Sequence, residues 1–219
     1  MAAYDAVLFD QDGVLVEPPA PETQARATRE AFAAAGADEI DEGAVADIVE
    51  GTTIDRIQEI AATHDLDPAV LWEAREHHDE QSQFAAFRAG DRAPYEDVGA
   101  VADRSQPCGV VSNNHDSTVR FVLDFFDFAP WFDTVRGRAK TLDSLRRKKP
   151  APDYLERARS ALDAETVLYV GDSAGDVLAA HRAGMDAALL RRPHNRGLAP
   201  ESAPAHEITP LHALPDVVG

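Results

Sequence analysis

The chain has 219 residues, a formal net charge of −18, three lysines and a single cysteine. Such a charge excludes the basic surface that nucleic-acid binding requires, and one cysteine excludes an intrachain disulfide. No apolar run reaches the length of a membrane span, and the N-terminus lacks a signal peptide's basic start, so we expect a cytoplasmic protein. An acidic, lysine-poor composition is also typical of halophilic proteins, in which salt screens the self-repulsion.

The first predicted element is a buried strand over residues 6–9, a short apolar run that ends in turn-forming residues. Residues 14–16 resemble another short strand, and residues 17–21 form a stiff, proline-rich linker. From residue 22 to residue 89 the apolar spacing is helical, with no strand-like alternation. This span begins with a helix over residues 22–35 and ends with a long helix that starts at residue 67.

Strands and helices alternate from residue 91 onward, which implies right-handed crossovers and a parallel sheet. Strands are predicted over residues 108–111, 132–135, 166–170 and 187–190, with a last one near residue 208. Helices are predicted over residues 98–102, 117–126, 141–145, 153–162 and 174–183, with a last one near residue 214. We therefore predict an α/β fold: a Rossmann-like core, residues 1–16 and 90–219, with an all-helical cap domain inserted over residues 17–89.

Polar side chains follow the predicted strands at the carboxyl edge, where parallel sheets bind ligands. Asp10 and Asp12 follow the first strand, Ser112 and Asn113 the second, and Asp172 a later one. Two carboxylates at the mouth of a buried strand need a cation or a shared proton. The pattern indicates a nucleophile at Asp10, an acid/base at Asp12 and Mg²⁺ as the counter-charge. Taken alone, the Asp-x-Asp-Gly stretch that begins at Asp10 is also compatible with a plain turn.

A fixed positive charge comes from the basic run that ends in Lys148 and Lys149. A compact ammonium suits a phosphoryl oxygen, and we assign this part to Lys149, whereas Lys148 fits a solvated loop. Asp176 has two interpretations. With Ser173 as N-cap it forms a capping box, and it is also a candidate for holding metal-bound water in the second shell.

Four ordered motifs, FDQDG, VVSNN, KKPAPD and GDSAGD, cover nearly the whole chain. This set resembles the haloacid dehalogenase-like hydrolases, above all the branch that contains phosphoglycolate phosphatase and β-phosphoglucomutase. The resemblance implies a Mg²⁺-dependent phosphatase that hydrolyses a small phosphorylated metabolite through an aspartyl-phosphate. It also leaves open a phosphosugar mutase, which shares these motifs. We expect a monomer or a weak homodimer.

The resemblance further implies a role for each motif residue. Asp10 attacks phosphorus, and Asp12 protonates the leaving oxygen and then activates water. Ser112 and Asn113 hold phosphate oxygens, and Lys149 neutralises both the phosphate and the nucleophile. The metal ligands are Asp10, the backbone carbonyl of Asp12, and Asp172.

The inserted helical cap domain is expected to select the substrate. Thr52 and Arg56 resemble the cap loop that faces the active site in this branch, although an ordinary helix start explains the threonine equally well. His115 follows the second motif and is a candidate for lining the entrance.

A serine esterase is the alternative function from another class of enzyme. Residues 171–175 match the nucleophile elbow G-x-S-x-G, with Ser173 as the nucleophile. Its triad would need a later acid and base, for which Asp186 and either His206 or His212 are available. No His-Gly-Gly oxyanion loop is present, and this interpretation leaves Asp10 and Lys149 without a role.

Overall fold

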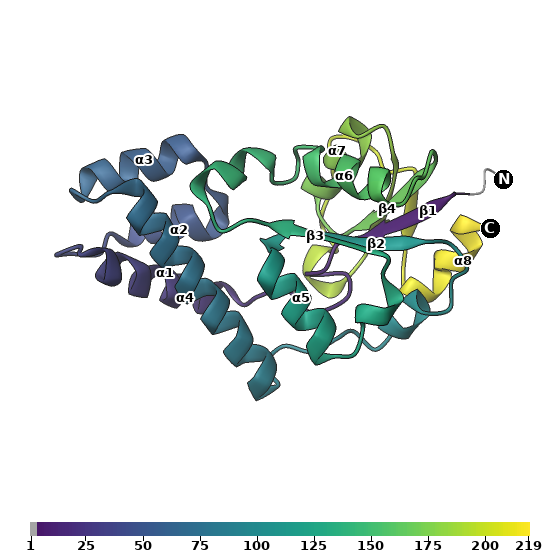
Figure 1. The fold of residues 1–219 in the computed structure, drawn as a ribbon, viewed down its shortest axis with the longest axis horizontal. Coiled ribbons are helices and arrows are strands. Elements are labelled where there is room, and N and C mark those ends of the chain that lie inside the picture. The colour runs from purple at the N-terminus through teal and green to yellow at the C-terminus, as the bar shows by residue number, and fades with distance from the viewer. Residues whose placement is uncertain (1–3) are drawn as a thin grey trace. The chain divides into compact units, whose positions relative to one another are not determined.

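A computed structural model describes residues 4–219, and Figure 1 shows the path of the chain. The described residues form two compact units. An α/β unit comprises the chain up to Pro18, Ala93–Gly137 and Arg147–Gly219, and a helical unit comprises Pro19–Arg92 and Arg138–Arg146. Each unit has its own buried core and is considered separately below.

The α/β unit is built on a six-stranded sheet with the strand order β3-β2-β1-β4-β5-β6. The pairs β1–β2, β1–β4, β4–β5 and β5–β6 are all parallel. The strands are β1 (Ala6–Phe9), β2 (Cys108–His115), β3 (Thr134–Arg138), β4 (Val167–Gly171), β5 (Asp186–Leu190) and β6 (His206–Ile208). This arrangement is the Rossmann-like α/β core that the alternating pattern predicts.

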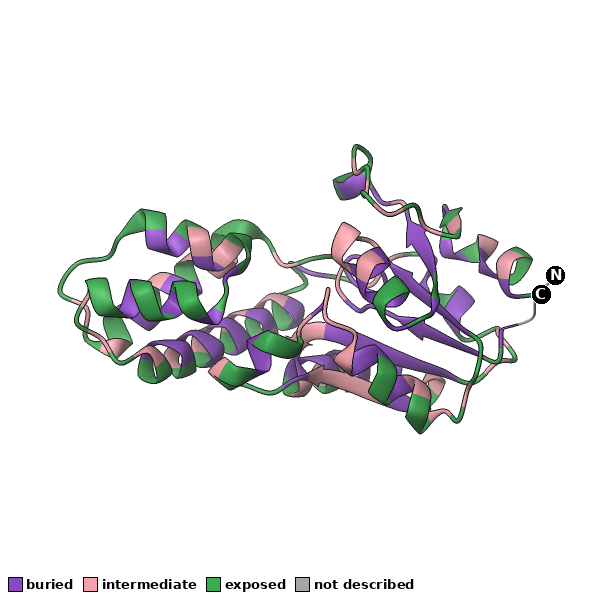
Figure 2. Cartoon of the chain, turned by 90° about the horizontal axis from the view of Figure 1, so that it is seen from above, coloured by how far each residue is buried: buried purple, intermediate pink, exposed green. Residues whose placement is uncertain are grey.

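Helices cover both faces of this sheet, with α6 and α7 on one face and α5 on the other (Figure 1). The helices of the unit are α5 (Asp116–Phe125), α6 (Asp153–Ala161), α7 (Ala174–Arg182) and α8 (Leu214–Val218). Short 3-10 helices are η1 (Val98–Val101), η2 (Ala129–Trp131), η4 (Pro193–Asn195) and η5 (Leu211–Ala213). Because both faces are covered, the central strands are buried along their length, as Figure 2 shows.

The helical unit contains α1 (Pro21–Ala35), α2 (Glu42–Gly51), α3 (Ile54–Thr63), α4 (Pro68–Ala89) and the 3-10 helix η3 (Leu142–Arg147), whose last residue belongs to the α/β unit. Local signals set these boundaries. Gly36 ends α1 in the left-handed conformation, and the side chain of Asp67 caps the first turn of α4. Apolar faces of the helices then pack into one core around Phe32, Ile57 and Leu71.

Residues 138–146 differ from the predicted domain boundaries, because they belong with the helical unit and not with the core. Arg138 pairs with Glu76 at 2.8 Å and Lys140 with Glu80 at 2.5 Å, so two ion pairs tie this segment to α4. Leu145 is buried in the core of the helical unit. Such pairings link residues sixty or more positions apart, which a local pattern does not reveal.

Two further local predictions differ from the structure. Residues 14 and 15 lie in a turn and Val16 forms isolated bridges with Asp12 and Pro94, although all three residues are buried. The short helix predicted over residues 141–145 is a 3-10 helix that covers residues 142–147. Within residues 4–219, no helix combines the length and the apolar character that crossing a bilayer requires.

Candidate active site

The register of the sheet brings three strand ends to one place. Phe9 pairs with Val110 on β2 and with Val170 on β4, so the residues after these positions emerge at the same carboxyl edge. The amide of Asp10 donates to the carbonyl oxygen of Val170 at 2.9 Å, which fixes Asp10 directly beside the end of β4. The ligand-binding edge expected from the sequence is therefore the edge at which these motifs meet.

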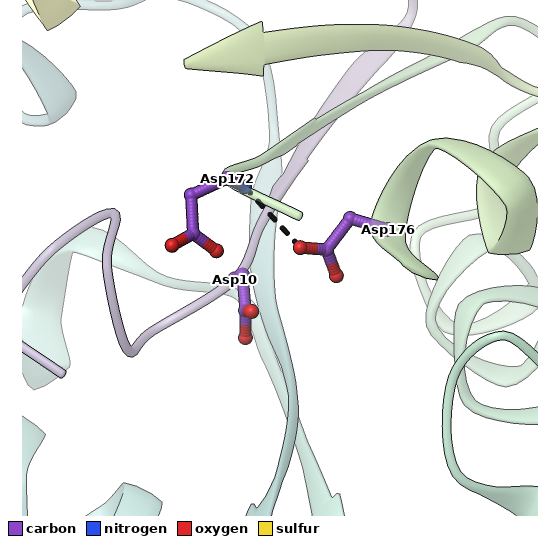
Figure 3. Close-up of side chains that lie close together, drawn as sticks. All are labelled: Asp10, Asp172 and Asp176. Carbon is purple, nitrogen blue, oxygen red and sulfur yellow. Dashed lines mark hydrogen bonds between the residues drawn. The ribbon is translucent and has the colours of Figure 1, made fainter. Parts of the chain in front are cut away.

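Three carboxylates gather at this edge (Figure 3). Asp10, Asp172 and Asp176 each offer one oxygen, and these oxygens lie within 4.8 Å of one another. The backbone amide of Asp172 donates to Oδ2 of Asp176 at 3.2 Å, the contact drawn as a dashed line in Figure 3. An all-oxygen donor set of this kind suits a hard divalent cation such as Mg²⁺.

Lys149 lies among these carboxylates. Its Nζ is 2.9 Å from Oδ2 of Asp10 and 2.7 Å from Oδ1 of Asp176. The same ammonium donates to the carbonyl oxygen of Val111 at 3.2 Å and lies 2.5 Å from the hydroxyl of Tyr169. Burial alone would lower the pKa of Lys149, but Asp10 and Asp176 outweigh it and raise the pKa. Lys149 is therefore a buried, permanently charged ammonium.

The charges of this cluster do not balance. Burial raises the pKa of Asp10 well above its usual range; Lys149 opposes this shift, while the charges of Asp176, Asp172 and Asp12 add to it. Burial and then the charge of Asp176 raise the pKa of Asp172 to about 7. Three carboxylates and one ammonium leave two negative charges when all are ionised. One divalent cation would neutralise them, so the residues present fit such a group.

Asp176 uses both of its carboxylate oxygens, one in the predicted capping box and the other against Lys149, while its part in the second shell of a metal stays a prediction. Its Oδ2 accepts from the amide of Ser173 at 3.0 Å and from the hydroxyl of Ser173 at 2.6 Å, which completes the capping box of α7. Its Oδ1 faces Lys149. Burial would raise the pKa of Asp176, but Lys149 and the donors from Ser173 hold it below the usual range. Asp176 thus stays ionised beside the ammonium.

Ser112 and Asn113 lie on β2, which continues through His115 and does not end at residue 111. Ser112 is buried, and its Oγ accepts from the amide of Asn114 at 3.2 Å. The side chain of Asn113 is engaged with the backbone of Lys149: its Nδ2 donates to the Lys149 carbonyl at 3.0 Å, and its Oδ1 accepts from the Lys149 amide at 2.7 Å. This reciprocal pair holds the lysine in place, and a part for Asn113 in phosphate binding stays a prediction.

Asp12 lies beside the carboxylate cluster, but its side chain is not one of the three that compose it. Its Oδ2 accepts from Nδ2 of Asn114 at 2.9 Å. Gly13 turns the chain with φ of 80°, and a Cβ atom at this position would lie 1.9 Å from Oδ2 of Asp172. Only glycine permits the two motif loops to approach this closely.

The remaining predicted residues have other surroundings. In the helical unit, Thr52 is buried and donates to the carbonyl of Thr53, and Arg56 pairs at the surface with Asp47 and Glu59. Their part in substrate binding stays a prediction. The prediction for His115 is wrong: the residue is fully buried on β2, with its Nδ1 3.2 Å from the hydroxyl of Thr118.

The contacts of the site that were not predicted from the sequence include Asn114 on Asp12 and Tyr169 on Lys149. Asn114 directly follows the predicted phosphate-binding pair, so its polar side chain at the carboxyl edge was a usable signal. Tyr169 offered no such signal, because it lies within an apolar strand and reads as a core residue.

The nucleophile elbow is not assembled. The hydroxyl of Ser173 donates to Asp176 and accepts from its amide at 3.1 Å, so it serves as the cap of α7. Asp186 begins β5 and pairs in register with Leu168, at the amino end of the sheet. The hydroxyl of Tyr4 links Asp186 to His206 there, whereas Ser173 follows the carboxyl end of β4. Ser173 is therefore separated from Asp186 and His206 by the length of a strand, so these three residues do not form a catalytic triad.

The sequence model of the family described as haloacid dehalogenase-like hydrolase matches residues 4–184. A phosphoglycolate phosphatase from Cereibacter sphaeroides is 30% identical over 216 residues, covering 95% of this chain and 91% of the relative. This chain belongs to the haloacid dehalogenase-like hydrolase family. Within the family it is similar to the phosphoglycolate phosphatases.

Solved structures agree on the fold. A predicted phosphoglycolate phosphatase from Haemophilus somnus superposes with a TM-score of 0.68 at 19% identity, covering 100% of both chains. CbbY from Rhodobacter sphaeroides, solved in complex with phosphate, gives a TM-score of 0.69 at 24% identity and covers 96% of both chains. At these identities the likeness concerns the fold and not the substrate.

Proposed function

We propose that this protein is a Mg²⁺-dependent phosphatase that hydrolyses a small phosphate monoester through an aspartyl-phosphate on Asp10. The observation that carries this proposal is the position of Lys149, whose ammonium bridges Asp10 and Asp176 at the edge where Asp172 also lies. A buried ammonium beside a buried carboxylate offers an anionic phosphoryl group both a counter-charge and a nucleophile.

The chain's own residues divide the reaction between them. An oxygen of Asp10 attacks phosphorus, the bond from phosphorus to the ester oxygen breaks, and Asp12 gives that oxygen a proton. Asp12 then takes a proton from water, which attacks the phosphoryl group, releases phosphate and restores Asp10. The contact from Asn114 to Oδ2 of Asp12 supports a fixed orientation for this acid/base. Ser112 is proposed to donate to a phosphoryl oxygen.

Asp10, Asp172 and the backbone carbonyl of Asp12 would hold the cation, with Asp176 close enough to bind it directly or through water. A bound Mg²⁺ supplies charge neutralisation between the incoming phosphoryl group and the carboxylates. The oxygen-only donor set and its two excess negative charges support a divalent ion here.

The substrate is proposed to be a small phosphorylated metabolite in the cytoplasm. Phosphoglycolate is the first compound to test, because the full-length relatives from Cereibacter sphaeroides bear the name phosphoglycolate phosphatase. A nucleic-acid substrate is disfavoured by the net charge of −18. Thr52 and Arg56 of the helical unit are proposed to contribute to substrate selection.

The proposal is tested by measuring inorganic phosphate released from p-nitrophenyl phosphate and from phosphoglycolate, with Mg²⁺ and with EDTA. We expect release with Mg²⁺, a loss with EDTA, and a fall of more than about 1,000-fold in kcat/KM for Asp10→Asn. Ser173→Ala should keep the activity and lose only about 1 kcal/mol of stability with its cap.

Activity that survives Asp10→Asn but disappears with Ser173→Ala would overturn the proposal in favour of a serine hydrolase. A phosphosugar mutase would instead isomerise a sugar phosphate without net release of inorganic phosphate, so the same assay separates the two members of the family.

A further inference from the structure

The segment that follows β5, residues 191–196, reaches back to the loop that carries Asp172. Asn195 anchors it there. Its Nδ2 donates to the backbone carbonyl of Asp172 at 2.7 Å and to that of Leu190 at 2.9 Å, while its Oδ1 accepts from the amide of Arg192 at 2.8 Å. Because both donor hydrogens and the acceptor of this buried amide are used, the segment is held firmly against the end of β4.

His194 is the neighbouring residue on the same segment. Its Nε2 lies 2.6 Å from Oδ2 of Asp172, although the residue itself is exposed. When Asp172 is ionised its carboxylate can only accept hydrogen bonds, so in that state Nε2 of His194 is the donor. The anchor from Asn195 to the Asp172 backbone places the imidazole one residue away from a fixed point, which limits its freedom to move.

Gly13 also approaches this oxygen. A Cβ atom there would lie only 1.9 Å from Oδ2 of Asp172, whereas it would lie 3.1 Å from Oδ1. Oδ2 therefore contacts the imidazole of His194 and lies closer than Oδ1 to the first motif loop. In Figure 3 one oxygen of Asp172 points toward Asp10 and the other points away from it.

We propose that His194 is a positioning residue that fixes the rotation of the Asp172 carboxylate. Held through Oδ2, the carboxylate presents Oδ1 to the cluster that it forms with Asp10 and Asp176. His194 thereby sets how tightly the cluster binds a divalent cation, without itself touching the substrate. This inference rests on the cation site of the proposed function, but it concerns cation affinity and not turnover.

The test is a titration of the cation-free protein with Mn²⁺, followed by calorimetry and without any substrate. His194→Ala should weaken Mn²⁺ binding about tenfold, the lower end of the effect expected when an outer hydrogen-bond donor to a metal ligand is lost. His194→Gln keeps an N–H donor and should restore most of the affinity. His181→Ala, which removes an exposed histidine at the end of α7, should bind Mn²⁺ like the unaltered protein.

The melting temperature without cation serves as the second measurement, and it should differ little between the three variants. Unchanged Mn²⁺ affinity in His194→Ala overturns the inference, and so does a His194→Gln variant that binds as weakly as His194→Ala. The proposed function can fail separately: a protein that binds Mn²⁺ but releases no phosphate would contradict the phosphatase and leave the role of His194 intact.

Discussion

At the scale of single residues, the site contains more carboxylates than positive charges, and burial together with this imbalance shifts their pKa values. Lys149 pairs with Asp10 and Asp176, and Oδ2 of Asp172 contacts the imidazole of His194. Asp176 gains further donors from Ser173, so its pKa lies below the usual range, whereas the pKa values of Asp10 and Asp172 are raised. Removing one member of a buried pair is costly because the other charge is left uncompensated.

Asp172 is the residue whose protonation should control cation binding. Burial and the charge of Asp176 raise its pKa from 3.8 to about 7 in the folded, cation-free protein. Because the pKa of Asp172 is higher in the folded than in the unfolded protein, protonation of this carboxyl stabilises the folded state. This stabilisation is complete below pH 3.8 and is lost as the pH rises through about 7. The metal ligand is the ionised form, so acid should oppose cation binding.

We therefore expect the affinity for Mg²⁺ to fall about tenfold per pH unit below 7 and to level off above it. Calorimetric titrations near pH 6, 7 and 8, each in two buffers of different ionisation enthalpy, measure the affinity and the protons released. A dissociation constant that is equal at both ends of this range, with no proton release, would contradict the raised pKa of Asp172.

At the scale of elements, the segment after β5 ties the motif loops to the rest of the α/β unit. The guanidinium of Arg192 forms a two-pronged pair with Asp97, at 2.8 and 2.9 Å, and also donates to the carbonyl of Val14 in the first motif loop. It stacks 3.9 Å from the ring centre of Tyr95. Asp97 in turn accepts from the amide of Leu211. One buried arginine thus joins segments from four parts of the sequence.

Arg192→Met should lower the free energy of unfolding by about 3–5 kcal/mol, because Asp97 would stay buried without its partner. Arg29→Met is the matched control. Arg29 forms the same two-pronged geometry with Glu42, at 2.8 and 2.6 Å, but both side chains are exposed. Its loss should cost far less stability, because solvent screens an exposed pair.

Urea unfolding of the two variants beside the unaltered protein gives both values. Adding Asp97→Asn to Arg192→Met should recover part of the loss, because the orphaned charge is removed. Equal destabilisation by the two arginine substitutions would show that burial does not decide the strength of this pair.

At the scale of the whole molecule, the dominant feature is the net charge of −18. Acidic side chains repel one another over distances set by the ionic strength, and this repulsion opposes the compact state. Raising KCl from about 0.1 M to about 1 M shortens the screening length from about 10 Å to about 3 Å. Most of the repulsion between surface charges is then lost.

We expect the melting temperature to rise by several degrees over this salt range, measured by differential scanning fluorimetry or circular dichroism. NaCl should act like KCl at equal ionic strength, because screening depends on charge and concentration. A flat or falling melting temperature would mean that self-repulsion does not limit the stability of this protein.

Much of the fold could be predicted from the local pattern of apolar and polar residues. A continuous apolar run such as residues 6–9 predicts a strand that is buried on both faces, and the alternation with helices predicts a parallel sheet. Because parallel strands end at one edge, the convergence of Asp10, Ser112 and Asp172 could be anticipated without coordinates. Helix boundaries were also readable from Gly36 and Asp67, since caps act over one turn.

Only the tertiary structure decided which side chains contact one another. Asn114 reaches Asp12 from 102 positions away, Asn113 holds the backbone of Lys149 from 36 positions away, and residues 138–146 join α4 of the helical unit. Hydrophobic periodicity depends only on residues that are neighbours along the chain, so it can be recognised in the sequence. Hydrogen-bond partners depend on strand register and on loops that pass close in space, so they exist only once the chain has folded.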